Sequence, residues 1–524
     1  MTQRKSEDRE VPDGHRKGTK TRGVESHGGG KAIPVKVAEG QLTLFFATAG
    51  NLPGGRAEGE GGAGRPTPRA QKVPKAKSRR KRAVPARVEE VVGGLDEAFE
   101  NVAKNKGAPG PDGETVELVR EHWEEISRKL RTELTAGTYQ PGDIRRVWIP
   151  KSSGGQRGLG IPNVVDRVIQ EAVRQVLEPV YEPTFHPSVH GFRPNRSCHT
   201  AMAEARGYVA EGYGWVVDLD LEKFFDRVHH QRLLGRLAKR VSDGRLLALV
   251  GRMLKAKVIL PEGVRVSTEE GVPQGGPLSP LLSNIVLSEL DEELARRGHR
   301  FVRYADDANI YVRSERAGKR VMESVKAFIQ RRLRLTVNAD KSAVARPQTR
   351  HFLGFRLVPG GKGEVETLLS ERSHKRLREK IRELTPRNAG ESLSATIRKV
   401  NVYLVGWSGY FGICTEGTEK VLQNADAHLR RRLRAVVLKH WKTKRTVAHR
   451  LVRLGVTRKT AWRNVYKGRQ STWALSHSPA VDRGLRNAYF AERGLESLWD
   501  RFRAIWTKPL VPVQLELPLG AERS

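Results

Sequence analysis

Cysteine and long apolar runs are both nearly absent from the chain. Only Cys198 and Cys414 occur among 524 residues, which argues against a disulfide framework and against a cysteine-rich zinc site. The first residues lack the apolar core of a signal peptide, and no stretch is long enough to span a bilayer. An amphipathic anchor with a clear apolar face is also missing. We therefore expect a soluble, intracellular protein without a membrane partner.

Acidic residues are few relative to basic ones. Lys and Arg number 95 against 59 Asp and Glu, which gives a formal net charge of +36. Charge of this size predicts a polyanionic partner, and nucleic acid is the natural one. A length of 524 residues is enough for two or three domains with substantial cores.

Residues 1–85 lack the apolar side chains that a folded core requires. They are rich in Gly, Pro, Lys, Arg and Ser, so we expect a disordered basic tail. One island, Gln41–Phe46, begins with Gln-Leu-Thr-Leu-Phe and resembles the short peptide with which bacterial DNA-handling proteins dock into the sliding clamp. The alternative is that this island packs back on the body of the protein or has no role.

The stretch Phe301–Val312 places Asp306 and Asp307 between two short runs of β-branched and aromatic residues. This pattern predicts a hairpin with both carboxylates at its turn. Adjacent acids repel each other and make a poor turn, so the concentrated charge points to a divalent cation with oxygen ligands, Mg²⁺ before others. For these two residues alone, a solvated Asp-Asp turn explains the pattern equally well.

A second group of acids lies on a strand pattern between residues 215 and 226. Side chains alternate along a strand, so Asp218 and Asp220 share one face while the apolar residues share the other. Acids on an apolar strand are costly to bury without a cation. Beside the Asp306–Asp307 turn, they would complete a carboxylate cluster that suits two metal ions.

Glycine-rich segments accompany these strands. Residues 145–162 predict a basic hairpin with a glycine tip, where Lys151 and Arg157 can reach a triphosphate; a merely solvated hairpin is the alternative. The Gly-Pro loop at 271–280 opens a helix, and its glycines let a ligand approach the backbone. Residues 190–197 predict an irregular basic loop.

Smaller elements are also expected from local patterns. The apolar spacing at 88–102 predicts one amphipathic helix. Asn163 is expected to cap the helix that follows it, with Asp166 in the first turn. Short strands are expected at 335–342 and 352–355.

The character of the chain changes after about residue 370. Basic helices with interleaved Trp and Tyr are predicted at 372–384, 397–411 and 426–445. Such helices suit a wide phosphate surface with stacking against unpaired bases. Residues 455–524 keep enough aromatic side chains for a small helical module, without a His-Asn-His or paired-cysteine nuclease signature.

Together these segments resemble the reverse transcriptase/maturase proteins encoded by bacterial group II introns. The resemblance covers roughly residues 88–500 and rests on Tyr-Ala-Asp-Asp, the Gly-Val-Pro-Gln-Gly-Gly-Pro-Leu-Ser-Pro loop, and two segments of the family's thumb, Trp407–Phe411 and Trp441–Arg445. The residues around the acid pair are most similar to the class C subgroup, whose members lack a C-terminal endonuclease.

The resemblance implies an α+β fold with four parts. A right-hand polymerase, with fingers and palm on an antiparallel sheet, is followed by an all-helical thumb (the maturase or X domain) and a small C-terminal helical DNA-binding region. The implied division is 1–85 for the tail, 86–365 for fingers and palm, 366–450 for the thumb, and 451–524 for the C-terminal region and tail.

The resemblance also implies roles for individual acids. In the family, the metal-binding aspartate stands five residues before a phenylalanine. That spacing selects Asp220 as a metal ligand and Phe225 as the steric gate against a ribose 2′-OH. Asp306 and Asp307 are implied as the remaining catalytic metal ligands, and Lys341 as the group that protonates or stabilises the leaving pyrophosphate.

Other implied contacts involve the nucleotide and the nucleic acid. Asp218 stands where the family tolerates other residues and becomes a supporting charge. The nucleotide is expected to contact Lys151, Arg157 and Gln274 as well as the steric gate. The expected nucleic-acid contacts are Arg193, Arg196, Arg430, Arg431, Arg432, Lys442, Lys444 and Arg445.

The implied function is RNA-directed DNA polymerisation by two-metal-ion nucleotidyl transfer, copying intron RNA during retrohoming, together with maturase binding of intron RNA to assist splicing. The implied cofactor is a pair of Mg²⁺ ions, with Mn²⁺ as a substitute. The implied partners are group II intron RNA, target DNA or a primer strand, and dNTPs, in the bacterial cytoplasm or nucleoid.

Two rivals remain open. A retron or defence-system reverse transcriptase is the nearest rival in chemistry, and an RNA-folding protein with a vestigial polymerase site is a rival of another class. The Lys106–Gly113 block and the long thumb favour the intron type, and the intact acids argue against decay.

Overall fold

The computed structural model describes residues 86–150, 155–360, 363–388, 390–468 and 471–507. The basic tail with its Gln41–Phe46 island lies outside these residues, and so does Lys151 at the hairpin tip. The described residues belong to one unit, Pro68–Ser524. Among the helices in these ranges, none combines the length and the apolar character that crossing a bilayer requires.

Helices before the first strand pack with α5 (Val164–Tyr181) around one apolar core. They are α1 (Val88–Gly93), α2 (Leu95–Lys104), α3 (Val116–Glu121) and α4 (Trp123–Ala136). The single helix expected at 88–102 is wrong, because the backbone leaves helical geometry at Gly94 and starts again. α4 ends at Gly137, whose φ of 71° is left-handed.

The expected cap at the start of α5 is also wrong. The Asn163 side chain makes no cap hydrogen bond; its Oδ1 accepts instead from the N–H of Asp112, 3.4 Å away. The reason is tertiary, since a Cβ on Gly110 would lie 2.3 Å from Asn163 Oδ1, which shows that this loop packs tightly over the helix end. Asp166 is buried and accepts from the Tyr139 hydroxyl at 2.6 Å.

The first sheet has the strand order β2-β1-β4-β5. β1 (Ile144–Pro150) pairs antiparallel with β2 (Gln156–Ile161), which confirms the expected hairpin. On its other side, β1 pairs in parallel with β4 (Val258–Ile259), which is joined to β5 (Arg265–Val266).

The central sheet has the order β6-β7-β3-β8, with antiparallel neighbours throughout. Its strands are β6 (Arg300–Tyr304), β7 (Asp307–Val312), β3 (Trp215–Leu219) and β8 (Ala343–Ala345). The expected acid hairpin is confirmed, with Tyr304 opposite Asp307. The strand expected at 335–342 is wrong, because the Asn338 side chain accepts from the N–H groups of Asp340 and Lys341 and forms a turn.

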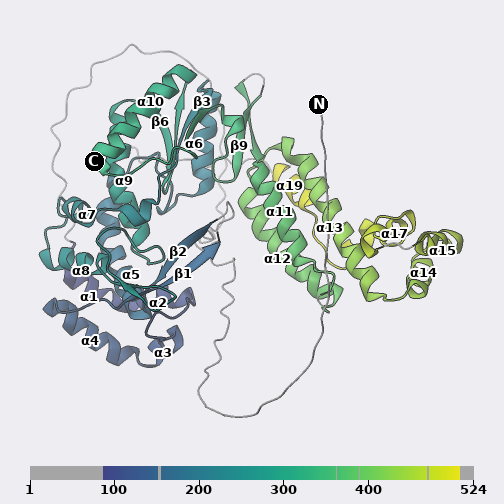
Figure 1. Ribbon diagram of the computed structural model, residues 1–524, viewed down its shortest axis with the longest axis horizontal. Helices are drawn as coiled ribbons and strands as arrows, with labels where there is room; N and C mark the ends of the chain where they lie inside the picture. Colours follow the sequence, from purple (N-terminus) through teal and green to yellow (C-terminus); the bar gives the residue numbers. More distant parts are fainter. Residues whose placement is uncertain (1–85, 151–154, 361–362, 389, 469–470, 508–524) are drawn as a thin grey trace, which may run out of the picture. The chain divides into compact units, whose positions relative to one another are not determined.

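Side-chain alternation gives the central sheet two buried faces. Val217, Phe301 and Ile310 join the core that includes α9 (Ser279–Arg296) and α10 (Glu315–Phe328). The opposite face joins the core that includes α6 (Cys198–Ala210); its members are Val216, Val302, Tyr304 and Tyr311. In Figure 1, α10 and α6 flank the sheet on opposite sides. Two further helices, α7 (His230–Leu237) and α8 (Gly244–Leu254), follow β3.

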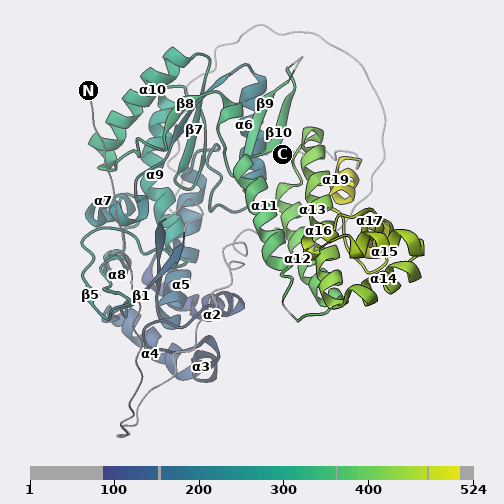
Figure 2. The same ribbon diagram turned by 45° about the vertical axis from the view of Figure 1, so that its right-hand side comes forward.

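A hairpin of β9 (Phe355–Pro359) and β10 (Val365–Leu369) contacts α6 and leads into long helices (Figure 2). The strand expected at 352–355 is wrong, since β9 begins only at Phe355 and Phe352 contributes a single bridge. The long helices are α11 (Glu371–Leu384), α12 (Leu393–Phe411) and α13 (Glu419–His440).

The helix expected at 426–445 is wrong at its end. Lys442 has a left-handed φ of 56°, and the Thr443 side chain caps the next helix, α14 (Lys444–Arg453). The remaining helices are α15 (Arg458–Tyr466), α16 (Thr472–Leu475), α17 (Pro479–Gly484), α18 (Asn487–Ala491) and α19 (Leu498–Trp506).

The last helix, α19, packs against the long helices α12 and α13. Asp426 of α13 accepts hydrogen bonds from the Ser497 hydroxyl (2.7 Å) and the N–H of Leu498 (3.0 Å), so it fixes the start of α19.

α14 spans residue 451, where the C-terminal region is expected to begin. The four-part domain division stays a prediction.

Candidate active site

Asp306 and Asp307 lie at the closed end of the β6–β7 hairpin. Ala305 has a left-handed φ of 56°, which is uncommon for a residue with a Cβ. The chain therefore reverses sharply, and Asp307 already pairs with Tyr304 as the first residue of β7. Asp306 is half-buried and Asp307 is exposed.

Asp220 comes to this turn from a strand far away in the sequence. It directly follows β3, and β3 pairs with β7 so that Leu219 lies opposite Ala308, the neighbour of Asp307. The backbone N–H of Asp220 donates to the Ser342 hydroxyl at 3.0 Å. Lys341 Nζ lies 3.7 Å from Asp220 Oδ1. The structure thus brings together the four residues expected to be catalytic.

The pKa values of the turn acids are raised. For Asp306, desolvation by the surrounding protein is the main cause; the charge of Asp220 adds to it and that of Arg157 opposes it. For Asp307, which solvent still reaches, desolvation followed by repulsion from Asp306 and other acids raises the pKa to about 7. Carboxyl groups crowded in this way hold their charge when a cation compensates it.

The acids offer the type of donor atom that a hard divalent cation prefers. Within the described ranges, three or more His, Cys, Asp or Glu side chains nowhere gather closely enough to form a protein-only metal site. Mg²⁺ does not require such a cage, because it is usually bound by one or two carboxylates together with water and substrate phosphates. Asp220, Asp306 and Asp307 offer only carboxylate oxygens, which is the donor type that this ion prefers.

The fourth acid, Asp218, is held in an ion pair. Its Oδ2 accepts from Arg350 at 2.8 Å (Nε) and 2.5 Å (Nη2). Burial raises the pKa of Asp218, and Arg350 opposes that rise. Arg350 also donates to the carbonyl of Lys341 at 2.6 Å. Arg350 therefore offsets the charge of Asp218 and fixes the segment that carries Lys341; no sequence pattern pointed to it.

Two expected nucleotide contacts meet beside the acids. Arg157 Nε, on β2, donates to Gln274 Oε1 at 2.9 Å. The Gly160 N–H donates to the carbonyl of Gln274 at 2.7 Å, which joins the Gly-Pro loop to the hairpin. Gly275, with φ of 131°, has no room for a side chain, since a Cβ would lie 2.4 Å from the carbonyl oxygen of Gly160.

Phe225, the expected steric gate, is joined to the same Gly-Pro loop. It lies in a short 3₁₀ turn, Phe224–Arg227, and its ring packs edge-on against Phe224 with centroids 5.1 Å apart. Its carbonyl accepts from the Val272 N–H at 2.6 Å.

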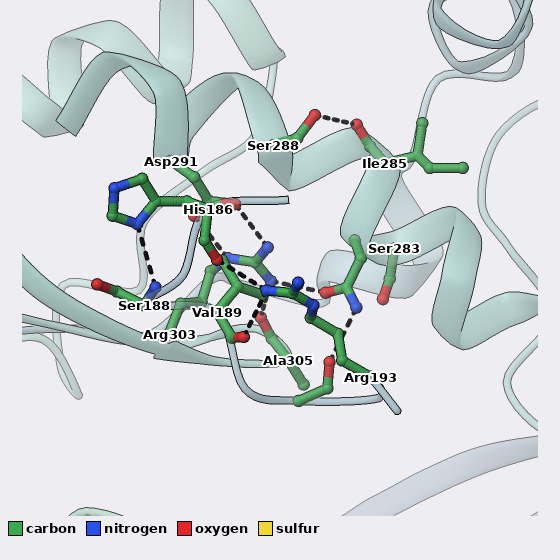
Figure 3. A network of polar contacts seen from close by, with 12 residues as sticks. His186, Ser188, Val189, Arg193, Ser283, Ile285, Ser288, Asp291, Arg303 and Ala305 are labelled. Carbon is green, nitrogen blue, oxygen red and sulfur yellow. Dashed lines mark hydrogen bonds and ion pairs between the residues drawn. The ribbon is translucent and has the colours of Figure 1, made fainter. Parts of the chain in front are cut away.

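A buried ion pair adjoins Ala305, the residue before the two turn acids (Figure 3). Arg303 of β6 is fully buried and donates to both carboxylate oxygens of Asp291 in α9, at 2.7 and 2.6 Å. Its Nη1 donates to the carbonyl of Ala305 at 2.8 Å and to Asn284 Oδ1 at 2.9 Å. Arg303 thereby bonds directly to the turn residue that carries the left-handed φ. Neither Arg303 nor Asp291 was identified from the sequence.

The same network holds the basic loop at 190–197. The N–H of His190 donates to the Arg303 carbonyl at 2.9 Å. Asn284 Nδ2 donates to the carbonyl of Gly191 at 2.8 Å. A Cβ on Gly191 would lie 2.2 Å from the Ala305 nitrogen, so the loop lies directly against the acid turn.

Several arginines expected to contact nucleic acid are engaged within the protein. The Arg193 side chain is 7% exposed and bonds the Glu182 carboxylate and nearby carbonyls. The Arg431 guanidinium lies 4.1 Å from the Trp473 ring centroid. Arg432 donates to the carbonyl of Thr385 at 2.6 Å. These arginines hold loops and helices together.

Other expected contacts are more open. Lys442, Lys444 and Arg445 are exposed where α13 gives way to α14, although Lys444 also donates to the carbonyl of Gly468 at 3.2 Å. Arg196 and Arg430 are half-buried. A nucleic-acid role for any of these residues stays a prediction.

Comparison with known proteins identifies two consecutive families along the chain. The family described as "Reverse transcriptase (RNA-dependent DNA polymerase)" matches residues 149–357, and "Group II intron, maturase-specific domain" matches residues 374–455. The first match contains the acid turn, and the second begins within α11.

Curated relatives agree with these matches. Protein YkfC of Escherichia coli (strain K12) is 34% identical over 354 residues, which cover 59% of this chain and 89% of YkfC. Group II intron-encoded protein LtrA of Lactococcus lactis is 32% identical over 324 residues, covering 49% of this chain and only 54% of LtrA. The Retron Mx65 reverse transcriptase of Myxococcus xanthus is 30% identical over 208 residues, or 38% of this chain.

Among solved structures, the partial Cas6-RT-Cas1–Cas2 complex matches 47% of this chain and 42% of its own chain, with 23% identity and a TM-score of 0.31. Proteins of the reverse transcriptase family use divalent metal ions, and the maturase domain implies binding of intron RNA. The expected α+β right-hand fold with a helical region after it is confirmed. With an acid-bearing central sheet followed directly by helices of the maturase type, the chain belongs to the reverse transcriptase/maturase family of group II intron-encoded proteins.

Proposed function

We propose that this chain copies intron RNA into DNA by adding deoxynucleotides to a primer 3′-OH, with two Mg²⁺ ions as cofactors and Mn²⁺ as a substitute. The observation that carries the proposal is the pairing of β3 with β7, which puts Asp220 beside the Asp306–Asp307 turn. Three carboxylates at one corner are the groups that would hold the ions. When bound, such ions lower the pKa of the primer hydroxyl and neutralise charge that develops on the leaving pyrophosphate.

The chain's own side chains would position the nucleotide. Arg157, already oriented by Gln274, suits bidentate contact with triphosphate oxygens. Lys341 Nζ, 3.7 Å from Asp220, suits donation of a proton or a hydrogen bond to the leaving pyrophosphate. Phe225 would exclude a ribose 2′-OH, and Lys151 would add a second positive charge at the hairpin tip.

The maturase part of the proposal concerns binding of intron RNA during splicing and insertion into target DNA during retrohoming. The supporting observation is an exposed basic segment at the junction of α13 and α14, made of Lys442 before α14 and of Lys444 and Arg445 in its first turn. Gln41–Phe45 would dock into the sliding clamp in a bacterial cytoplasm. Alanine at Leu44 and Phe45 is then expected to lower mobility while primer extension stays normal; unchanged mobility would remove the clamp from the proposal.

Primer extension on poly(rA)/oligo(dT) tests the polymerase proposal. Asp307→Asn and Asp306→Ala are expected to abolish DNA synthesis and to leave RNA binding largely intact, because each removes a metal ligand and no RNA contact. Glu323→Gln, an exposed acid-to-amide change on α10, is the matched control and is expected to extend normally. Undiminished synthesis by either aspartate variant would overturn the proposal.

A further inference from the structure

A basic cavity opens at the end of the β6–β7 hairpin that lies away from the acid turn. Its volume is about 560 Å³, which is within the range of about 300–1,000 Å³ typical of ligand sites. Its exposed or half-buried charged and aromatic lining comes from the loop before β3, the two strand ends, the turn before β6 and one side of α10. These residues are Tyr213, Arg297, His299, Arg300, Arg313 and Arg320.

The cavity is separate from the polymerase site. Arg300 pairs with Tyr311 at one end of the β6–β7 ladder, and Tyr304 pairs with Asp307 at the other. Arg300 and Tyr304 are four residue steps apart along β6, and at about 3.3 Å per step this is about 13 Å. A ligand in this cavity therefore occupies different space from a nucleotide at the acids.

Most of the positive charge in the cavity lacks a carboxylate partner. Arg297 is paired, with Glu293 at 2.7 Å. Arg313 instead lies over the Tyr213 ring, 4.7 Å from its centroid, and Arg300 lies 5.9 Å from the centroid of Tyr208. Among the described residues, no carboxylate forms an ion pair with Arg313 or Arg320, and none of the lining side chains is acidic. Arg300 differs, because a hydrogen bond with Tyr213 and the charge of Glu211 both raise its pKa.

The chemistry of this lining matches a nucleic-acid strand. Guanidinium groups bind phosphate oxygens in bidentate fashion. Tyrosine rings and arginine planes stack on bases that have left a duplex. Arg313 and Arg320 lie next to Tyr213, which is only half-buried, so groups for both kinds of contact are present at one place. The cavity has the size of a small-ligand site, so it suits a short single-stranded segment and is too small for a duplex.

We propose that this cavity binds the sugar-phosphate backbone of single-stranded RNA, as an RNA contact on the palm apart from the template path. The proposal rests on the binding of intron RNA and adds the surface that makes part of that contact. A free mononucleotide offers the same phosphate chemistry, so the experiment must separate the two sources.

The test compares two double variants on and beside α10. Arg313→Gln/Arg320→Gln removes two charges from the cavity. The control, Arg316→Gln/Lys319→Gln, removes two charges from exposed positions on the same helix that do not line the cavity. Circular dichroism melting checks that both variants remain folded, which is expected because all four side chains are exposed.

The main measurement is the affinity for intron RNA over a series of salt concentrations. The cavity variant is expected to bind at least about tenfold more weakly and to lower the slope of log K against log salt by about 1.4, since each phosphate contact on a single strand contributes about 0.7. The control is expected to keep the wild-type slope. Equal slopes for both variants, or an unchanged slope in the cavity variant, would refute the RNA site.

Two further measurements separate the remaining explanations. Calorimetric titration of the wild-type chain with AMP and with short oligouridine is expected to detect the oligonucleotide only; AMP binding that the cavity variant loses would overturn the RNA assignment in favour of a mononucleotide. Asp307→Asn, which should end DNA synthesis, is expected to keep the RNA salt slope. Failure of the polymerase proposal and failure of this site are therefore seen in different assays.

Discussion

The ion pair between Arg303 and Asp291 offers the sharpest test of how the acid turn is held. Each side chain is 1% exposed, so replacement of Arg303 by Met leaves the Asp291 carboxylate buried without its partner. Breaking a buried pair in this way costs about 3–5 kcal/mol. The carbonyl of Ala305 and Asn284 Oδ1 lose a donor as well, which adds to the cost. We therefore expect Arg303→Met to lower the free energy of unfolding by at least about 3 kcal/mol.

A double variant separates stability from positioning. In Arg303→Met/Asp291→Leu, no buried charge is left unpaired, and replacing a buried pair by apolar side chains is often neutral or stabilising. Most of the lost stability should return. The hydrogen bond from Arg303 to the Ala305 carbonyl does not return, so the acid turn stays free to shift. Because a shift of about 1 Å can cost about 10²-fold in rate, kcat for primer extension is expected to fall by about that factor while KM for dTTP changes little.

Urea denaturation followed by tryptophan fluorescence measures the first effect, and steady-state extension on poly(rA)/oligo(dT) measures the second. Arg503→Met is the matched control, because it breaks an ion pair with Asp500 in which both side chains are 62% exposed. Such a pair contributes about 0–1 kcal/mol. A double variant with wild-type kcat would refute the positioning role of Arg303. A single variant no less stable than Arg503→Met would refute the buried pair itself.

Further predictions concern charge and fit at the acid site and the basic side chains of the helical region. Because the pKa of Asp307 is raised to about 7, its carboxyl is protonated below that pH and cannot bind a cation; the Mg²⁺ concentration for half-maximal extension should rise as pH falls through 7. A raised carboxyl pKa also means that, without metal, stability is lost as pH rises through about 7; thermal melting at several pH values, with and without Mg²⁺, checks both signs. Phe225→Ala is expected to raise incorporation of ribonucleotides relative to deoxynucleotides by at least about tenfold, which is the selectivity that one contact in a binding pocket typically provides. Unchanged selectivity would reject the steric gate. Lys442→Gln/Lys444→Gln/Arg445→Gln should lower the RNA salt slope by about 2, whereas Arg432→Gln, which loses its bonds to Thr385, should lower the melting temperature.

The sequence predicted best the elements that follow from side-chain alternation along a strand and from long motifs. The 301–312 hairpin and the shared face of Asp218 and Asp220 follow from alternation along a strand, and the structure confirms the hairpin. Only the family resemblance indicates which of these two acids is expected to bind a metal ion. The structure adds a reason for the choice, since Asp218 is already paired with Arg350 while Asp220 lies beside Lys341.

Predictions from local rules failed where a distant segment competes for the same group. Asn163 has the right side chain for a helix cap, but its side-chain oxygen accepts instead from the N–H of Asp112, in the loop near Gly110. Arg350 and Asp218 are 132 positions apart, and no window on the sequence links them. Arg193 and Arg432, which are expected at phosphates, each bond a carboxylate or carbonyl of the folded chain, and their nucleic-acid role stays a prediction. Net charge predicts the partner of the whole protein, and only packing tells which arginines are free.

The acid turn itself explains why such tertiary support is needed. Two adjacent carboxylates repel each other, and a left-handed φ at Ala305 costs about 1–2 kcal/mol for a residue with a Cβ. Local interactions therefore oppose the conformation that places Asp306 and Asp307 beside Asp220. Arg303 counters both effects, since it bonds the Ala305 carbonyl and its positive charge opposes the rise in the pKa of Asp306 that desolvation causes. Asp291 in turn offsets the free-energy cost of burying the Arg303 charge. Both Asp291 and Asn284, which bond Arg303, lie in α9. The helix opened by the Gly-Pro loop thus supports the acid turn, while Gln274 of the loop itself holds Arg157 by a hydrogen bond.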